Sequence, residues 1–267
     1  ICNLGVCYEL GKGGLTMDEA KAVEWYQKAA EAGHAIAICN LGVCYELGKG
    51  GLTMDEAKAV EWYQKAAEAG HAIAICNLGV CYELGKGGLT MDEEKAVKHY
   101  QKAAEAGSAT AMCNLGNCYF NGRGGLAMDE EKAVEWYQKA AEAGDVGAMY
   151  DLGVCYDHIQ GELEKAMEWY QKAAEAGNAM AMYDLALHYY NGKGGLMKDE
   201  KKAVEWLKKA AEAGYASAMF ELGFCYELGL WGLTVDKVKA EEWYQKEEEA
   251  RNSKAAERLQ ELEGKSS

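Results

Sequence analysis

Ten cysteines recur at two positions along the chain and are the first candidates for chemistry. The first set is Cys2, Cys39, Cys76 and Cys113, and the second is Cys7, Cys44, Cys81, Cys118, Cys155 and Cys225. Cysteines five residues apart on a helix are separated by about 140° and ~7.5 Å along the axis, whereas a disulfide needs Cα atoms within ~7 Å. The pattern therefore predicts free thiols that pack as small apolar side chains. Free thiols favour an intracellular reducing compartment.

The histidines do not complete a metal-binding or catalytic pattern. His34, Cys39 and Cys44 follow one another at intervals of five residues, whereas zinc needs four converging ligands and usually a CxxC pair. His158 and His188 have no nucleophile or carboxylate at a recognisable spacing. We therefore expect no metal, no cofactor and no enzymatic activity.

Two glycine-rich segments resemble phosphate-binding loops only superficially. Gly11-Lys12-Gly13-Gly14 precedes a helix whose first turn carries Asp18 and Glu19, which would repel an anion. The terminal Gly264-Lys265-Ser266 lacks both the earlier glycine and the preceding strand of a P-loop. The first segment is better interpreted as a helix stop.

Charge and hydropathy exclude several classes of partner. The chain has a formal net charge of −15, which disfavours nucleic acid and an anionic membrane surface. No stretch of 18 consecutive apolar residues is present, so we expect no membrane insertion. The remaining partner class is a protein or peptide, basic or apolar in character.

A repeat of 37 residues organises the chain. Residues 38–74 repeat residues 1–37 without a change, and further units begin at Met112, Met149, Met182 and Met219, with the third at Ile75. The fifth unit is four residues shorter, around residues 159–161. We expect seven repeats over residues 1–252.

Each unit contains two helical patterns and no strand pattern. In the first unit, one helix covers about residues 1–10 and a second about 18–32, separated by the glycine stop. Ala22, Tyr26, Ala29 and Ala30 form a stripe that predicts the buried face of the second helix. Thr16 and Glu19 fit a capping box at its start, with Thr16 as the N-cap. A helical hairpin of this size cannot bury its own apolar face, so the fold class is an all-α superhelical solenoid in one continuous stack.

The repeat resembles the Sel1-like repeat, a relative of the tetratricopeptide repeat. In the second unit the residues that carry the resemblance are Leu41, Gly42, Tyr45, Gly48, Gly50, Asp55, Lys58, Ala59, Trp62, Tyr63, Lys65, Ala66, Ala67 and Gly70. An extra glycine in most turns, His99 in place of tryptophan and Leu207 in place of tyrosine depart from the pattern. The resemblance implies an α-solenoid that serves as a protein-binding scaffold or adaptor.

Analogy with tetratricopeptide solenoids places a concave groove on the face of each first helix that points away from the second. Side chains at these positions vary along the chain, and the C-terminal half gains aromatic residues that could anchor a partner. The predicted groove residues are Asn77, Val80, Glu83, Asn114, Asn117, Phe120, Tyr150, Asp151, Val154, Tyr183, Asp184, Leu187 and Tyr190. Asp151 and Asp184 are expected to select a basic or amide-bearing segment.

The two ends of the array lead to further expectations. Glu247 and Glu248 replace two packed alanines in the seventh unit, and residues 253–267 are expected to form a capping helix and tail with Ala256, Leu259 and Leu262 facing inward. The first hairpin has no comparable cap. We therefore expect a binding scaffold that holds its partner in the groove. The alternative is a structural subunit that docks into a larger complex through its first repeat.

Overall fold

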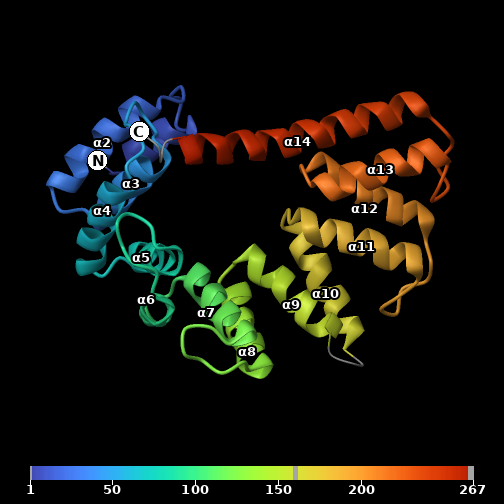
Figure 1. The fold of residues 1–267 in the computed structure, drawn as a ribbon, viewed down its shortest axis with the longest axis horizontal. Helices are drawn as coiled ribbons and strands as arrows, with labels where there is room; N and C mark the ends of the chain where they lie inside the picture. The colour runs from blue at the N-terminus through green and yellow to red at the C-terminus, as the bar shows by residue number, and fades with distance from the viewer. Residues whose placement is uncertain (1, 159–161, 264–267) are drawn as a thin grey trace. The chain divides into compact units, whose positions relative to one another are not determined.

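The computed structural model describes the backbone of residues 2–158 and 162–263 and the side chains of 3–158 and 162–251. Within these ranges the chain forms fourteen helices and no strand (Figure 1). The predicted all-α repeat architecture is confirmed. Where the sequence suggested one continuous stack, the contacts divide the chain into two compact units, Ile1–Asp145 and Val146–Ser267.

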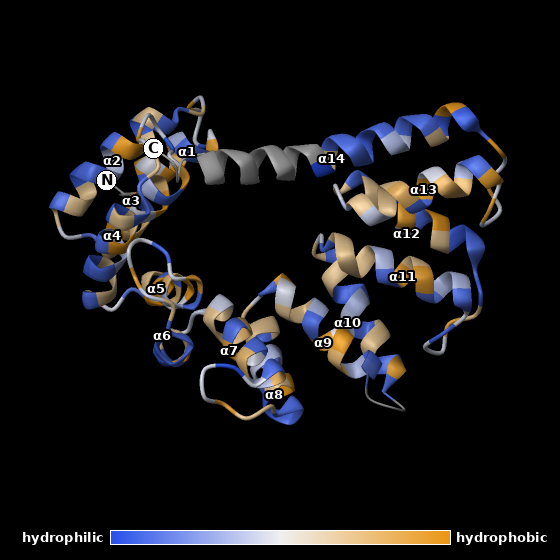
Figure 2. Ribbon diagram, viewed as in Figure 1, coloured by the Kyte–Doolittle hydropathy of each residue, from blue (hydrophilic) through white to orange (hydrophobic). Residues whose placement is uncertain are grey.

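Each unit is a succession of helical hairpins. The first contains α1 (Cys2–Leu10), α2 (Glu19–Glu31), α3 (Ala35–Leu47), α4 (Glu56–Glu68), α5 (Ala72–Leu84), α6 (Glu93–Glu105), α7 (Ala109–Asn121) and α8 (Glu130–Glu142). The second contains α9 (Val146–His158), α10 (Leu163–Glu175), α11 (Ala179–Asn191), α12 (Glu200–Glu212), α13 (Ala216–Leu228) and α14 (Lys237–Glu263). Hydrophobic and hydrophilic residues alternate along most helices (Figure 2), as expected where one face packs on a neighbour.

The helix boundaries follow from caps and glycines. Asp18, rather than Thr16, is the N-cap of α2, because its carboxylate accepts a hydrogen bond from the Lys21 backbone N–H at 3.0 Å and the helix begins one residue later. The predicted capping box is therefore wrong in its register. At the end of α3, Gly48 adopts a left-handed φ of 63° and donates its N–H to the Cys44 carbonyl.

A glycine–tyrosine contact holds the two helices of a hairpin together. A Cβ added to Gly42 would lie 2.5 Å from the ring of Tyr63, which is fully buried. Only glycine permits this approach. The sixth repeat replaces both partners at once, with Ala186 in the glycine position and Leu207 in the tyrosine position, both fully buried. The smaller side chain on one helix accommodates the added methyl group on the other.

The predicted burial of Cys44, Cys81 and Cys118 is confirmed, and all nine described cysteines are free thiols. Cys39, Cys76 and Cys113 are also buried, although they stand at the position that the predicted groove residues Tyr150 and Tyr183 occupy in later repeats. A small thiol at this position packs between neighbouring hairpins. For example, the Asn114 amide lies 3.7 Å from the Cys76 sulfur.

The eight buried thiols are expected to react slowly with a disulfide reagent at pH 8. Burial raises the pKa of Cys39 to about 12 and the pKa of Cys44 to about 11, so the reactive thiolate form is rare at that pH. Titration with and without denaturant measures the effect, and denatured, non-reduced protein should release all ten thiols. Recovery of only eight thiols from the denatured protein, or a rapid reaction of more than two thiols in the native protein, would contradict this packing.

The departure from the repeat at His99 leaves a cavity. In the preceding repeat the equivalent residue is Trp62, which packs against the buried cluster that includes Leu41 and Cys44. Beside His99, by contrast, there is a cavity of about 200 Å³ lined in part by Ala67, Ile75 and Leu78. The imidazole is smaller than the indole that occupies this position in the other repeats.

The His99→Trp variant is expected to raise the free energy of unfolding by about 1–2 kcal/mol, because the indole fills apolar space and gives the Lys102 ammonium an aromatic face. Lys65 lies 4.3 Å from the Trp62 ring centroid at the same spacing in the second repeat. Urea unfolding measures the change. The control is Lys98→Glu, which introduces the glutamate that the other repeats carry at this exposed position. A destabilised His99→Trp protein would show that the cavity cannot accept the ring.

The C-terminal end differs from its prediction. The expected break near Ser253 is absent, since α14 is continuous from Lys237 to Glu263. The count is thus fourteen described helices rather than the expected fifteen. Ala256, Leu259 and Leu262 lie outside the residues whose side chains are described. Glu247 is buried and forms an ion pair with Arg251, which compensates the charge at this former alanine position. Across the described residues, no helix has the length and apolar character needed to cross a bilayer.

Candidate functional site

A tyrosine–carboxylate hydrogen bond recurs inside the hairpins. Its acceptor is the glutamate at the position of the predicted groove residue Glu83. The hydroxyls of Tyr26, Tyr63 and Tyr100 donate to Glu9, Glu46 and Glu83 at 2.6, 2.6 and 2.5 Å. Tyr244 donates to Glu227 at 2.7 Å in the last repeat. These bonds join the end of the first helix to the middle of the second, so the carboxylates have a structural role.

A cation from the following repeat completes this arrangement in the first unit. Lys49 lies 3.9 Å from Glu9, Lys86 lies 3.3 Å from Glu46, and Arg123 lies 3.3 Å from Glu83. Each carboxylate thus receives a tyrosine hydroxyl from its own hairpin and a cation from the next. We call this repeated set the carboxylate ladder.

The ladder is absent from the fourth repeat, where Phe120 stands at the glutamate position, and between the fifth and sixth repeats its components are present but do not pair in the same way. Asp157 occupies the glutamate position and is one methylene shorter. The Tyr170 hydroxyl of the same hairpin has no hydrogen-bond partner among the described residues, although the tyrosine is only 2% exposed. Likewise, Lys193 forms no ion pair with any described residue. The closest partner of Asp157 is His188, whose Nε2 lies 3.7 Å from Oδ2.

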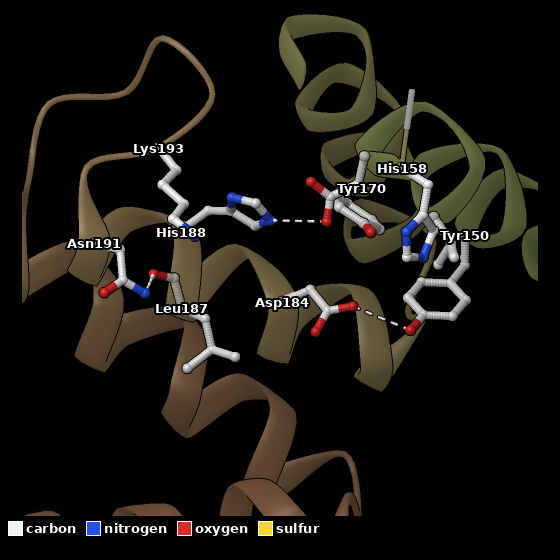
Figure 3. Close-up of a pocket in the computed structure, with 10 residues that line it drawn as sticks. Tyr150, His158, Tyr170, Asp184, Leu187, His188, Asn191 and Lys193 are labelled. Atoms are coloured by element: carbon white, nitrogen blue, oxygen red, sulfur yellow. Dashed lines mark hydrogen bonds and ion pairs between the residues drawn. The ribbon is translucent and has the colours of Figure 1, made fainter. Parts of the chain in front are cut away.

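These unpaired groups surround a pocket of about 390 Å³ in the second unit (Figure 3). Four of the predicted groove residues line it, namely Tyr150, Val154, Asp184 and Leu187. Six further residues complete the lining, namely Asp157, His158, Tyr170, His188, Asn191 and Lys193. The first helices α9 and α11 of two successive hairpins supply most of the wall, and α10 supplies Tyr170.

Hydrogen bonds and aromatic contacts fix the position of several walls. The Tyr150 hydroxyl donates to Asp184 Oδ2 at 3.0 Å, which links α9 to α11. The Tyr150 and Tyr170 ring centroids are 5.8 Å apart, and the same distance separates Tyr170 from His188. The Asn191 amide donates to the Leu187 carbonyl at 2.8 Å, so its side-chain oxygen remains available.

Burial dominates the electrostatics of the pocket. Burial raises the pKa of Asp184, and the neighbouring Asp157 charge raises it further, while the Tyr150 hydroxyl opposes both effects. Burial also lowers the pKa of His188, which opposes the attraction of Asp157, and Nδ1 of this histidine has no hydrogen-bond partner. His188 is therefore neutral at pH 7, and the two carboxylates outnumber the single Lys193 ammonium.

The predicted groove residues of the first unit are largely engaged within the fold. Glu83 belongs to the carboxylate ladder, and Asn117 accepts a hydrogen bond from the Tyr137 hydroxyl at 2.7 Å. Val80 packs on a buried cluster. Asn77, Asn114 and Phe120 are half-buried. No described pocket gathers these residues as the second unit gathers Tyr150, Val154, Asp184 and Leu187.

The other predicted anchors lie beside the pocket. Tyr183 is half-buried and precedes Leu187 by one helical turn on α11. Its ring meets the ring of Tyr215 edge-on, with the ring centroids 5.3 Å apart. Tyr190 stacks on Trp231 at 4.5 Å, so much of its ring is covered by the next repeat. Asp151 is half-buried on α9 next to Tyr150.

Sequence reasoning missed the part of the site that breaks the repeat. His188 stands at a position that is cysteine in the other six repeats, and Asp157 stands in the glutamate column. His188 departs from a position that is otherwise constant, whereas the position of Asp157 also holds Phe120 in the fourth repeat and Tyr190 in the sixth. Comparing equivalent positions of the repeats would have singled out His188, but its proximity to Asp157 depends on the stacking of α9 and α11.

The pocket combines acidic, aromatic and aliphatic side chains. No group of three or more histidine, cysteine or carboxylate side chains with metal-binding geometry occurs within the described part of the chain. The side chains instead offer two acidic acceptors, two tyrosine hydroxyls, one ammonium and apolar wall from Val154 and Leu187. A ligand that fits must be polar on one side and able to contact aromatic rings.

Solved structures of similar proteins share this architecture. A Sel1 repeat protein from Oxalobacter formigenes is 31% identical, with a TM-score of 0.77 over 92% of this chain and 96% of the other. The protective antigen c5321 of uropathogenic Escherichia coli strains, which has an SLR fold, is 33% identical with a TM-score of 0.65 over 93% of this chain and 53% of the other. Immunity protein Pa5087 from Pseudomonas aeruginosa, 24% identical with a TM-score of 0.58 over 81% of each chain, shares the fold. No curated protein sequence matches this chain.

The Sel1 repeat family model matches seven consecutive segments, residues 1–34, 35–71, 72–108, 109–145, 146–178, 179–215 and 216–246. From the second repeat on, these segments begin three residues before the repeats defined from the sequence, near the first residues of α3, α5, α7, α9, α11 and α13. Sel1 repeats commonly mediate protein–protein interactions. With matches along nearly its whole length, this chain belongs to the Sel1 repeat family.

Proposed function

We propose that the protein is a non-enzymatic scaffold that binds a segment of a partner protein over α9 and α11. The observation that carries this proposal is the convergence of four predicted groove residues in one pocket, beside the half-buried Tyr183. Leu187 joins the two parts of the surface, because it lines the pocket and lies one turn from Tyr183 on the same helix. We call Tyr150, Val154, Tyr183 and Leu187 the anchor surface.

The anchor surface has the character of a peptide-binding site. Aromatic and aliphatic side chains supply contact area, and the pocket supplies polar groups that can fix the orientation of a bound segment. In the first unit, the corresponding carboxylates are paired within the carboxylate ladder and are not available in the same way. Binding is therefore expected in the second unit.

Selection of a random peptide library on the immobilised protein tests the proposal. Peptides that bind the wild type should lose affinity for the Leu187→Asp variant, which places a charge at the centre of the anchor surface. They should bind Glu168→Ala normally, because Glu168 is exposed on α10 in the same unit. Circular dichroism checks that both variants keep their helices.

Two results would overturn the proposal. In the first, Leu187→Asp retains all selected peptides while a change on the first repeat, such as Leu10→Asp, releases them; Leu10 is exposed at the end of α1. Docking through the first repeat would then replace groove binding. In the second, selection yields no peptide that distinguishes the wild type from Leu187→Asp.

A further inference from the structure

The break in the carboxylate ladder leaves Tyr170 and Lys193 without a carboxylate partner, and Asp157 is paired with His188 instead. In the first unit, Tyr63 of the second repeat and Lys86 of the third both contact Glu46. In the pocket between α9 and α11, the equivalent Tyr170, Lys193 and Asp157 do not contact one another. Tyr170 is almost completely buried and lines the pocket, so its unpaired hydroxyl is directed into the pocket (Figure 3). Nδ1 of His188, which lines the same pocket, is buried without a hydrogen-bond partner, and such an atom is costly unless a ligand supplies a partner.

A second acidic group joins Asp157 at the same site. Asp184 stands where the first four repeats carry asparagine, and the charge of Asp157 acts on it. Two carboxylates in a half-buried pocket repel each other, and a cation between them would remove this cost. Lys193 does not fill this role, since it pairs with no described carboxylate and Figure 3 shows it on the His188 side of the pocket.

We propose that the pocket is the binding site for an arginine side chain of the partner, with the guanidinium held by Asp157 and Asp184. This inference rests on the proposed function, because it names the part of the partner that enters the pocket. The planar guanidinium can donate to carboxylates on two different helices at once, which a lysine ammonium does less well. It also stacks on aromatic rings, and Tyr150 and Tyr170 provide them.

The remaining groups of the pocket have roles in the same complex. The Tyr170 hydroxyl can accept a guanidinium N–H, and the Lys193 ammonium can donate to a main-chain carbonyl beside the arginine. Val154 and Leu187 can contact the aliphatic part of the side chain. The neutral His188 adds no repulsive charge. A volume of about 390 Å³ accommodates a long side chain.

The experiment titrates the protein with N-acetyl-L-arginine amide and with N-acetyl-L-citrulline amide, followed by NMR. The citrulline compound has nearly the same shape but no charge. We expect the arginine compound to bind with a Kd of about 1 mM, as is usual for such a small ligand, and the citrulline compound at least tenfold more weakly. The largest shifts should fall on residues of α9 and α11.

Isosteric variants identify the carboxylates. Asp157→Asn and Asp184→Asn should each weaken arginine binding at least tenfold, whereas Glu168→Gln on α10 should have no effect. The folding of Asp184→Asn is not in question, because asparagine occupies this position in the first four repeats. The affinity should also fall as the pH is lowered from 7 towards 5, because the pKa of Asp184 is raised and its protonation removes the charge.

The outcomes separate this inference from the proposed function. Equal binding of the two compounds, or unchanged binding by both aspartate variants, would overturn the arginine site. If the selected peptides bind the anchor surface without requiring arginine, the proposed function stands and the arginine site is wrong. If the arginine compound binds as described but no peptide distinguishes Leu187→Asp, the arginine site stands and the proposed peptide groove is wrong.

Discussion

The Gly79→Ala variant is expected to lower the free energy of unfolding by about 2 kcal/mol, although alanine is the better helix former. The intrinsic preference for alanine in a helix is about 1 kcal/mol and acts in the opposite direction. The added Cβ would lie 2.6 Å from the ring of Tyr100, which is fully buried and cannot move aside. Overpacking of this kind costs about 1–3 kcal/mol and can exceed it, so the clash outweighs the helix preference.

The Tyr100→Leu variant is also expected to be destabilised, by about 2–4 kcal/mol, because it leaves a cavity and removes the hydrogen bond to Glu83. The double variant reproduces the natural pair Ala186 and Leu207 of the sixth repeat. Its loss of stability should be smaller than the sum of the two single losses by at least about 1 kcal/mol.

Urea unfolding of the four proteins completes this double-mutant cycle. The reverse change provides a matched comparison, since Leu207→Tyr should clash with Ala186 and be relieved by Ala186→Gly. Additive effects of Gly79→Ala and Tyr100→Leu, within about 0.5 kcal/mol, would show that the two positions do not restrict each other.

The Tyr183→Ala variant is expected to weaken binding of a selected peptide at least about thirtyfold, because truncating an interface anchor typically costs ~2 kcal/mol or more. Tyr183 is half-buried and its ring is held by Tyr215, so a partner meets a side chain that has already lost much of its freedom. Tyr183→Phe should retain most of the affinity if the ring supplies the contact area. Fluorescence anisotropy with a labelled peptide measures both effects.

The controls for this prediction lie on the outer faces of second helices. Glu24→Ala on α2 and Glu168→Ala on α10 remove exposed charges and should leave binding unchanged. Thermal unfolding of Tyr183→Ala shows whether the lost contact with Tyr215 affects the fold. If Tyr150→Ala and Tyr183→Ala both bind normally while Glu24→Ala does not, the groove is not the binding surface.

The sequence alone determined the repeat architecture, because the signals for it are local and occur seven times. The glycines after each first helix and the stripe of Ala22, Tyr26 and Ala29 depend only on residues within one hairpin. The burial of Cys44, Cys81 and Cys118 could be predicted for the same reason. The error at Thr16 is also local, since two neighbouring residues could cap the helix and the aspartate side chain does so.

Only the tertiary structure decided which polar groups remain available. Glu83 was predicted to face a partner, but its carboxylate is used by Tyr100, 17 residues away, and by Arg123, 40 residues away. These separations carry no local signal. Cys76 likewise became buried because a neighbouring hairpin covers its side of the helix.

The candidate site shows the same division. Tyr150 and Asp184 could be selected from the sequence because the side chains at their positions change from repeat to repeat, and folding does not require that change. Asp157 and His188 could not be placed beside them, because they meet only when the helices of two successive hairpins stack. The physical reason is that a repeat determines the contacts of its own side chains locally, whereas a pocket between repeats depends on how two hairpins pack against each other.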